Sequence, residues 1–409
     1  MRWLNTEEIQ NFLEPHNYDV RLSGNARWID QKCAADVVTI VADCIWQFVS
    51  AQPGIGFTTK DIWHADYTIE NVQAIFKKPG VVDSNAKNEY DKFFQQPMEM
   101  LAYAGVLGKV KEGAQNIYSV LNVDVLSYIA LRERNALTFL QLYIQKVLSD
   151  SGLEPCFAKF FKAQTQNSYH AVKSAFENFT IKFTKINNVV ECRRIFIKVV
   201  NPLAYWHNAR GTEAGRLSKH KITYDMLMYN RDNFRDLTSQ KPKDLTRRQY
   251  ASELGLKRSD GFVAYSSQKA KRVVREFNGK YRAGISEVLE PNHMGDQAVH
   301  IHHIFPQAEF TELCAYYENL IALTPTQHLS YAHPQGHTQK IDEQYQNLCL
   351  IAKAASIEET LSDKSRDQIY EFNRFMYVLG VGLDDKRFEA IPEHDFVSAL
   401  AAINLAYSI

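Results

Sequence analysis

The sequence lacks the features that mark secreted, membrane-spanning or zinc-ribbon proteins. Its 409 residues include six cysteines, and no two of them have the Cys-x-x-Cys spacing, which argues against a zinc ribbon and favours buried thiols in a reducing cytosol. No apolar run approaches membrane-spanning length, and residues 1–8 lack the basic-then-apolar order of a signal peptide. We therefore expect a soluble cytoplasmic protein with no membrane partner.

The chain also lacks a net charge, an internal repeat and a low-complexity tract. Lysine and arginine number 47, as do aspartate and glutamate, so the total charge indicates no class of partner. The charges are unevenly distributed, however. Residues 210–282 hold eighteen basic and eight acidic residues, an excess of +10, and the rest of the chain has an excess of −10. This asymmetry favours a segment that contacts DNA phosphates, although a solvated helical face could produce part of it.

The N-terminal part of the chain predicts helices followed by a β-hairpin. Apolar spacing predicts helices over residues 33–50, 57–63 and 87–104, and residues 105–110 and 117–121 flank a polar turn. Three helices followed by a hairpin resemble a winged helix, a fold often used to bind DNA. A small packing or dimerisation domain is an equal alternative.

Helices are also expected in the middle and at the C-terminal end. Residues 123–206 are helical in pattern and rich in aromatic residues, which we interpret as core; a platform for unstacked bases is the alternative. Residues 341–354, 366–382 and 392–407 predict amphipathic helices that brace the protein or form a dimer face.

The basic segment offers three candidate elements for contact with DNA. Residues 246–256 contain the Ala-x-x-x-Gly step of a helix-turn-helix, residues 266–278 predict a basic helix, and Gly211 and Gly215 bracket a predicted flexible loop. The sequence does not decide which of them reads bases in the major groove. The candidate DNA-binding residues are Arg210, Arg216, Arg247, Arg248, Lys269, Lys271, Arg272 and Arg275.

The most specific pattern in the chain is a histidine cluster that begins at Val299. Residues 299–306 are β-branched and apolar with interleaved histidines and predict a short buried strand, and residues 320–323 predict a second strand. Thr324 then suits a helix N-cap, with a proline at the first helical position and Gln327 completing a capping box. The prediction is a ββα unit whose helix carries His328 on its first turn.

This arrangement suits phosphodiester hydrolysis, which needs a base for water and a cation near the leaving oxygen. Adjacent strand residues point to opposite faces, so one of His302 and His303 can hold a metal while the other accepts a proton. His328 is the natural second ligand, and Asn319 can bind the backbone of the loop before the second strand. A single histidine on a strand is usually a surface or hydrogen-bonded core group, so the inference depends on these elements occurring together.

These residues resemble the HNH, or ββα-metal, nuclease motif, and most closely its colicin nuclease variant. The matching residues are His302-His303-Ile304-x-Pro306, Asn319-Leu320 and Thr324-Pro325-x-x-His328. The resemblance implies that His303 is the general base, His302 and His328 are metal ligands and Asn319 organises the loop. It also implies a divalent metal ion, with Mg²⁺ expected and Mn²⁺ or another divalent ion as alternatives.

The chain departs from the colicin-type pattern at one position. That pattern has a further histidine four residues after His328, where this chain has Ala332. His333 follows one residue later and would lie about 140° from His328 around an ideal helix. We therefore expect His333 to lie outside the ligand set unless the helix ends before it.

An HNH unit within a larger, partly basic chain resembles a bacterial Type II restriction endonuclease. The expected architecture is mainly α with small β elements (α+β). It has a winged-helix-like domain (1–122), a helical middle (123–206), a basic segment (207–290), the nuclease unit (291–340) and a helical C-terminal region (341–409). The resemblance implies a homodimer that cleaves specific sequences of double-stranded DNA to 5′-phosphate and 3′-hydroxyl ends. The alternatives are a modification-dependent, phage-defence or homing HNH nuclease, and a non-catalytic DNA-binding regulator.

Overall fold

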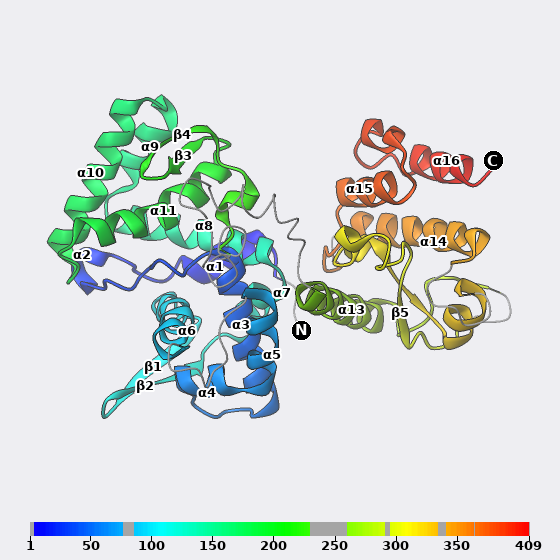
Figure 1. Cartoon of the computed structure of the whole chain (residues 1–409), viewed down its shortest axis with the longest axis horizontal. Coiled ribbons are helices and arrows are strands. Elements are labelled where there is room, and N and C mark those ends of the chain that lie inside the picture. Colours follow the sequence, from blue (N-terminus) through cyan, green and yellow to red (C-terminus); the bar gives the residue numbers. More distant parts are fainter. Residues whose placement is uncertain are drawn as a thin grey trace, which may run out of the picture. The chain divides into compact units, whose positions relative to one another are not determined.

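The computed structural model describes residues 4–76, 86–229, 260–290, 295–333, 341–363 and 365–408. The chain divides into two compact units, Met1–Lys257 (unit 1) and Arg258–Ile409 (unit 2). The described residues are mainly helical, with two-stranded antiparallel sheets β1–β2, β3–β4 and β5–β6 (Figure 1). This confirms the predicted class of mainly α with small β elements. The predicted basic segment, residues 207–290, has residues in both units.

The first part of unit 1 consists of helices that lead to a β-hairpin. The predicted helices over residues 33–50, 57–63 and 87–104 are present as α3, α4 and α6, and the predicted hairpin is β1–β2. The sequence pattern did not reveal α5. The elements are α1 (Thr6–Leu13), α2 (Val20–Ser23), α3 (Ala35–Ala51), α4 (Thr59–His64), α5 (Asp66–Phe76), α6 (Ala86–Tyr103), β1 (Leu107–Glu112) and β2 (Gln115–Val120).

A third extended segment joins this hairpin. Phe57, between α3 and α4, exchanges two backbone hydrogen bonds with Tyr118 of β2, at 2.8 and 2.9 Å. The Tyr118 hydroxyl donates to Glu99 of α6 (2.7 Å), which also accepts a hydrogen bond from Lys109 of β1 (2.6 Å). These contacts fix the hairpin to α6.

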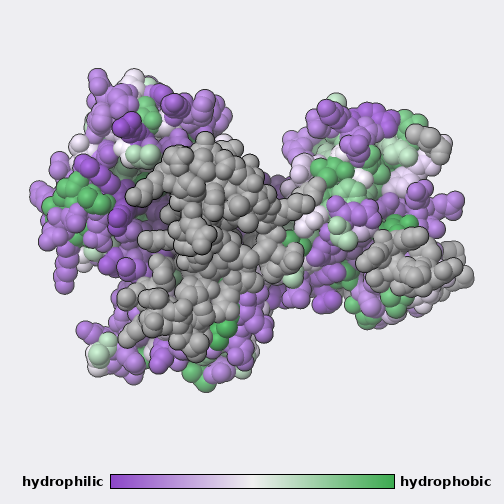
Figure 2. All heavy atoms as spheres, in the orientation of Figure 1, coloured by the Kyte–Doolittle hydropathy of each residue, from purple (hydrophilic) through white to green (hydrophobic). Residues whose placement is uncertain are grey.

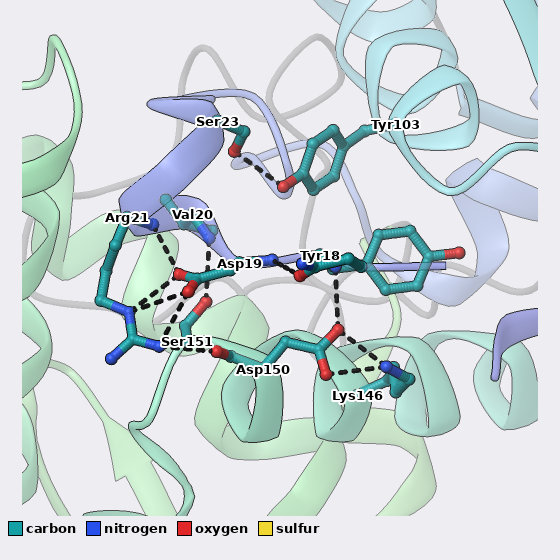
Figure 3. Close-up of polar contacts among 10 residues, drawn as sticks. Tyr18, Asp19, Val20, Arg21, Ser23, Tyr103, Lys146, Asp150 and Ser151 are labelled. Atoms are coloured by element: carbon teal, nitrogen blue, oxygen red, sulfur yellow. Dashed lines mark hydrogen bonds and ion pairs between the residues drawn. The ribbon is translucent and has the colours of Figure 1, made fainter. Parts of the chain in front are cut away.

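Polar contacts join the segment around α2 to the end of α8 (Glu133–Asp150) (Figure 3). The Asp150 carboxylate accepts hydrogen bonds from the Tyr18 backbone N–H (2.8 Å) and from Lys146 Nζ (2.7 Å). Arg21 donates to the Asp19 carboxylate (2.8 Å) and to the Asp150 carbonyl oxygen (2.9 Å). The Asp19–Arg21 pair holds the pKa of Asp19 below its usual value, mainly through the side-chain hydrogen bond.

The second part of unit 1 is a helical layer with a small hairpin. Most of its aromatic side chains are buried, which confirms their interpretation as core; Phe139, Tyr143, Phe160 and Phe176 have no exposed surface. The elements are α7 (Val123–Leu131), α8 (Glu133–Asp150), α9 (Glu154–Ala163), α10 (Gln166–Phe183), α11 (Val189–Trp206), β3 (Arg210–Glu213), β4 (Arg216–Lys221) and the 3₁₀ helix η1 (Tyr224–Leu227).

The prediction of a flexible loop between Gly211 and Gly215 is wrong, because these residues form the β3–β4 hairpin. Ala214 and Gly215 have positive φ angles of 48° and 77° and make the tight turn. Thr212 is buried and shares a 2.7 Å hydrogen bond with the Tyr169 hydroxyl. Hydrogen bonds to α10 and the other strand therefore order the segment that its glycines had suggested was mobile.

Unit 2 contains the histidine cluster. α13 (Asp260–Arg282) packs against both β5 (His300–His303) and β6 (Leu320–Leu323), and three helices follow them. The described residues on the face shown in Figure 2 are mostly hydrophilic, with hydrophobic residues in small groups. The remaining elements are η3 (Thr311–Leu313), η4 (Tyr317–Asn319), the π-helix η5 (Gln327–Ala332), α14 (Glu343–Ser362), α15 (Phe372–Gly382), η7 (Lys386–Ala390) and α16 (Phe396–Ala406).

Candidate metal centre

The strand pair predicted from the sequence is present as β5 and β6. The two strands are antiparallel, with His302 opposite Ile321 and His303 opposite Leu320. All four residues of β6 are buried, as expected for an apolar strand in a core. Successive residues of β5 face opposite sides, so His300 and His302 share one side and His303 faces the other.

The turn from β6 into the following helix has the predicted capping box. The Thr324 N–H donates to Gln327 Oε1 (3.0 Å), and the Gln327 N–H donates to Thr324 Oγ1 (3.2 Å). Gln327 is fully buried, and its amide also accepts from Ser286 Oγ (2.5 Å) and donates to the Val288 carbonyl oxygen (3.0 Å). The start of the helix, and with it His328, is therefore fixed to the segment that follows α13.

The helix that carries His328 is a π-helix from Gln327 to Ala332, which the sequence did not predict. In a π-helix the backbone bonds join residues five apart, whereas an α-helix joins residues four apart. His333 follows His328 by five residues, so the wider turn returns it to the same side. The expectation that His333 would lie away from His328 assumed an ideal α-helix and is wrong.

His302, His328 and His333, here called the histidine trio, converge on one point. Each offers a ring nitrogen, and the three nitrogens lie within 4.8 Å of one another. The ring centroids are 5.0 Å apart in all three pairs, and the ring planes are inclined by 65° to 80°. His300 stacks on His328, with 4.8 Å between the two ring centroids.

The trio fits a metal ion on two further observations. Nδ1 of His328 is buried and has no hydrogen-bond partner among the described residues. A buried nitrogen without a partner is destabilising unless a ligand such as a metal ion binds its lone pair. Ligand nitrogens around a tetrahedral ion would lie about 3.3 Å apart, given metal–nitrogen distances near 2.0 Å. A small inward movement of the three rings would therefore complete such a site.

Burial and mutual proximity lower the pKa of His302 and of His328. Desolvation is the main cause for His302, whose pKa lies well below its usual value, and the two other members of the trio add to the effect. The pKa of His328 is lowered to about 4 by burial, then by His333 and His300. These two imidazoles are neutral near pH 7, which is the form that binds metals.

His303 lies on the other side of β5. It is 8% exposed, and its Nε2 is 3.1 Å from the Cys314 carbonyl oxygen and 3.4 Å from Ser267 Oγ of α13. Burial is the main cause that lowers the pKa of His303 to about 4, and the charge of Lys271 lowers it further. The hydrogen bond to the Cys314 carbonyl oxygen has the opposite, smaller effect. Nδ1 of His303 makes no hydrogen bond to the described residues. A neutral imidazole held by one nitrogen can accept a proton at the other.

Asn319 joins the two ends of the loop between β5 and β6, as predicted. The Phe305 N–H donates to Asn319 Oδ1 (2.8 Å), and Asn319 Nδ2 donates to the carbonyl oxygens of Phe305 (3.1 Å) and Leu313 (3.3 Å). Asn319 has no exposed surface. All of these bonds are to backbone atoms, so this residue fixes the shape of the loop.

A buried ion pair that the sequence did not reveal is hydrogen-bonded to the backbone of β6. Lys353 Nζ of α14 is 3.0 Å from Glu287, and both side chains are almost completely buried. Glu287 Oε1 also accepts a hydrogen bond from the Ala322 N–H of β6 (2.9 Å). The partners are 66 residues apart in the sequence, so no local pattern could have indicated the pair.

The predicted DNA-binding residues occupy different settings. In unit 1, Arg210 donates to the backbone carbonyl of Gln164 at the end of α9, and Arg216 is exposed on β4. Arg247 and Arg248, with the predicted helix-turn-helix, lie outside the described residues. The predicted basic helix is part of α13, where Lys269 is mostly buried, Lys271 and Arg272 are half-buried, and Arg275 is exposed.

Comparison with family models, curated proteins and solved structures found no match to this chain. In the parts of the chain that the structure describes, no helix has both the length and the apolar character needed to cross a membrane.

Proposed function

We propose that the chain is a metal-dependent endonuclease of the HNH type that hydrolyses phosphodiester bonds of double-stranded DNA. The observation that carries this proposal is the convergence of three imidazole nitrogens within 4.8 Å, on the strand and helix where the motif places ligands. His303, the position of the general base in the motif, is the next residue along β5. Asn319 supports the proposal because its bonds hold the intervening loop.

The proposed reaction divides the work between the two sides of β5. His303 accepts a proton at Nδ1 from a water molecule, whose oxygen attacks the phosphorus as the bond to the 3′ oxygen breaks. The products are a 5′-phosphate and a 3′-hydroxyl, the second of which takes its proton from solvent. His302, His328 and His333 would hold a metal ion, which would supply positive charge for the leaving oxygen.

The donor set favours a transition metal over the Mg²⁺ expected from the sequence. Mg²⁺ prefers oxygen ligands in octahedral geometry, whereas imidazole nitrogens suit Zn²⁺, Ni²⁺ and related ions. Only histidines form the group identified in the described residues. We therefore propose Zn²⁺ or Ni²⁺ as the ion, and titration of the protein with each, against Mg²⁺ and Mn²⁺, tests the choice.

Unit 1 supports a role in selecting the DNA sequence. The order of α3, a β-bridge at Phe57, α4, α5, α6 and the β1–β2 hairpin resembles a winged helix with one additional helix, α5. We propose that this part recognises DNA and that two copies of the chain act together, one per strand, as in a Type II restriction endonuclease. The runner-up functions are a modification-dependent or phage-defence nuclease and a DNA-binding regulator.

Cleavage of plasmid DNA with each divalent metal tests the proposal. His303→Ala should lower the cleavage rate by a factor of about 100 or more, the usual contribution of a general base, while DNA binding and metal binding persist. His170→Ala, a change at an exposed histidine of α10, is the matched control and should cut as the wild type does. DNA binding without metal-dependent cleavage would favour the regulator instead.

A second comparison separates the nuclease classes. Plasmid prepared with and without base methylation should be cut differently by a modification-dependent enzyme, which needs the modified form. A restriction enzyme cuts the unmodified form. Sequencing the ends of the fragments would then give the cleaved sequence and show whether the 5′ ends carry phosphate.

A further inference from the structure

α13 brings a line of polar and basic side chains to the candidate site. Ser267 Oγ is 3.4 Å from His303 Nε2, so this face of the helix adjoins the proposed base. Lys271 follows Ser267 by four residues and Arg275 follows Lys271 by four. Residues four apart are neighbours on a helix surface, about 6 Å apart along the axis. Lys271 and Arg275 therefore extend away from His303 on one face of α13.

These two cations differ from Lys280 and Arg282 of the same helix in having no acidic partner among the described residues. Lys280 pairs with Asp367 (2.7 Å), and Arg282 pairs with Glu359 (3.0 Å). Lys269 Nζ donates to the Tyr265 hydroxyl (3.1 Å). In the described residues, no hydrogen bond or ion pair engages Lys271 or Arg275, although Lys271 is half-buried.

Lys271 is half-buried one helical turn after Ser267, whose hydroxyl oxygen lies 3.4 Å from His303 Nε2. Burial, and then Arg275, lower the pKa of Lys271 itself. A half-buried ammonium beside another cation is destabilised until an anion binds. Lys271 is thus suited to bind a negatively charged group.

We propose that Lys271 and Arg275 bind two successive phosphates of one DNA strand, and that the phosphate at Lys271 is the one that is cleaved. This assignment rests on the proposed function for the position of the reacting phosphate, and on the geometry of α13 for the two contacts. Lys271 would stabilise charge that develops in the transition state. Arg275 would hold the neighbouring phosphate in the same way before and during the reaction.

The two residues should therefore have different kinetic effects. Lys271→Met should lower kcat for plasmid cleavage by about 100-fold, as removal of one transition-state donor does. Arg275→Met should raise KM by about tenfold with kcat unchanged, as expected for loss of one charge-assisted contact made equally in both states. Lys271→Arg, which keeps the charge, should recover most of the lost rate.

Lys280→Met is the matched control, because Lys280 lies nine residues after Lys271 and so about 180° around the helix. It removes the same charge from the same helix but from the face that pairs with Asp367. Its kcat and KM should equal those of the wild type. A Lys280→Met variant as impaired as Lys271→Met would overturn the proposal, since net charge alone would then explain the effects.

The salt dependence of binding to plasmid DNA tests the contacts independently of cleavage. The slope of log K against log salt should fall by about 0.9 in each of Lys271→Met and Arg275→Met, and remain unchanged in Lys280→Met. Unchanged slopes in both test variants would overturn the proposal even if the wild type cuts DNA. Reduced slopes in a protein that does not cut would support the phosphate contacts and reject the nuclease assignment.

Discussion

The imidazole rings of His302 and His333 lie 5.0 Å apart and almost perpendicular, at 79°, although an α-helix would direct His333 away. The π turn of residues 327–332 is what brings them together. π turns are rare and occur often at functional sites. Here the turn gives a five-residue spacing the geometry that a four-residue spacing would have on an α-helix.

The helix register can be tested by changing its length. Deletion of the exposed Ser330 should convert the segment to an α turn with its two histidines four residues apart. Metal affinity should then stay within about tenfold of the wild type, a loss no larger than that caused by substitutions of residues that only support metal ligands. Insertion of one alanine after Ser330 should abolish high-affinity binding. Ser330→Ala is the control for the loss of the side chain. Calorimetric titration with Zn²⁺ or Ni²⁺ measures all three, and equal binding by the deletion and insertion variants would contradict the role of the π turn.

Each member of the histidine trio should be needed for metal binding. We expect His302→Ala, His328→Ala and His333→Ala each to lower the affinity by more than about 100-fold, the upper range for residues that merely support ligands. His300→Ala, at the stacking residue on the same face of β5, should cost about tenfold or less. Wild-type affinity in His333→Ala would mean that His302 and His328 suffice without it.

Asn319 should matter for stability as well as for the site. Asn319→Ala removes three hydrogen bonds and leaves the buried Phe305 N–H without its acceptor, so the free energy of unfolding should fall by about 2–4 kcal/mol. Urea unfolding followed by circular dichroism measures this. Asn404→Ala, at an exposed asparagine of α16, should change it by less than about 0.5 kcal/mol; similar losses in the two variants would refute the loop-organising role.

The Glu287–Lys353 pair should be more costly to break than to replace. Glu287→Gln leaves a buried ammonium without its counter-charge and should destabilise the protein by about 3–5 kcal/mol. The double variant Glu287→Gln/Lys353→Met removes both charges, while the glutamine carbonyl can still accept from the Ala322 N–H. It should recover most of that loss in urea unfolding. A double variant less stable than the single one would show that the ion pair itself is net stabilising.

The same pair should make stability depend on acid pH. Burial alone would raise the pKa of Glu287, but the Lys353 ammonium and the Ala322 N–H together lower it below its ordinary value. A carboxyl group whose pKa is lower in the folded state stabilises the protein above its unfolded pKa of about 4.3. That contribution is lost as the pH falls through the lower, folded value. The free energy of unfolding should therefore decline more steeply below about pH 4 in the wild type than in the double variant, and parallel declines would exclude Glu287 as a cause.

Local sequence patterns were sufficient for the parts of the site that short-range chemistry controls. Alternation of apolar residues and histidines located β5 and placed His302 and His303 on opposite sides. The Thr324–Gln327 capping box located the start of the helix that carries His328. Each depends on residues within one strand or one turn, where hydrogen-bond geometry and side-chain period follow directly from residue type.

Tertiary structure decided what those patterns left open. The sequence shows that His333 follows His328 by five residues, but the assumption of an ideal α-helix placed its side chain on the wrong side. Hydrophobic periodicity does not indicate whether a turn is α or π. The β3–β4 hairpin is ordered by Tyr169, and β6 is supported by Glu287 and Lys353, residues distant in the sequence. The residues of the basic segment became distinguishable only when burial and ion pairs separated Lys271 and Arg275 from Lys269 and Lys280. Sequence by itself determined which residue types meet at the site, and packing between distant segments determined which of them are free to act.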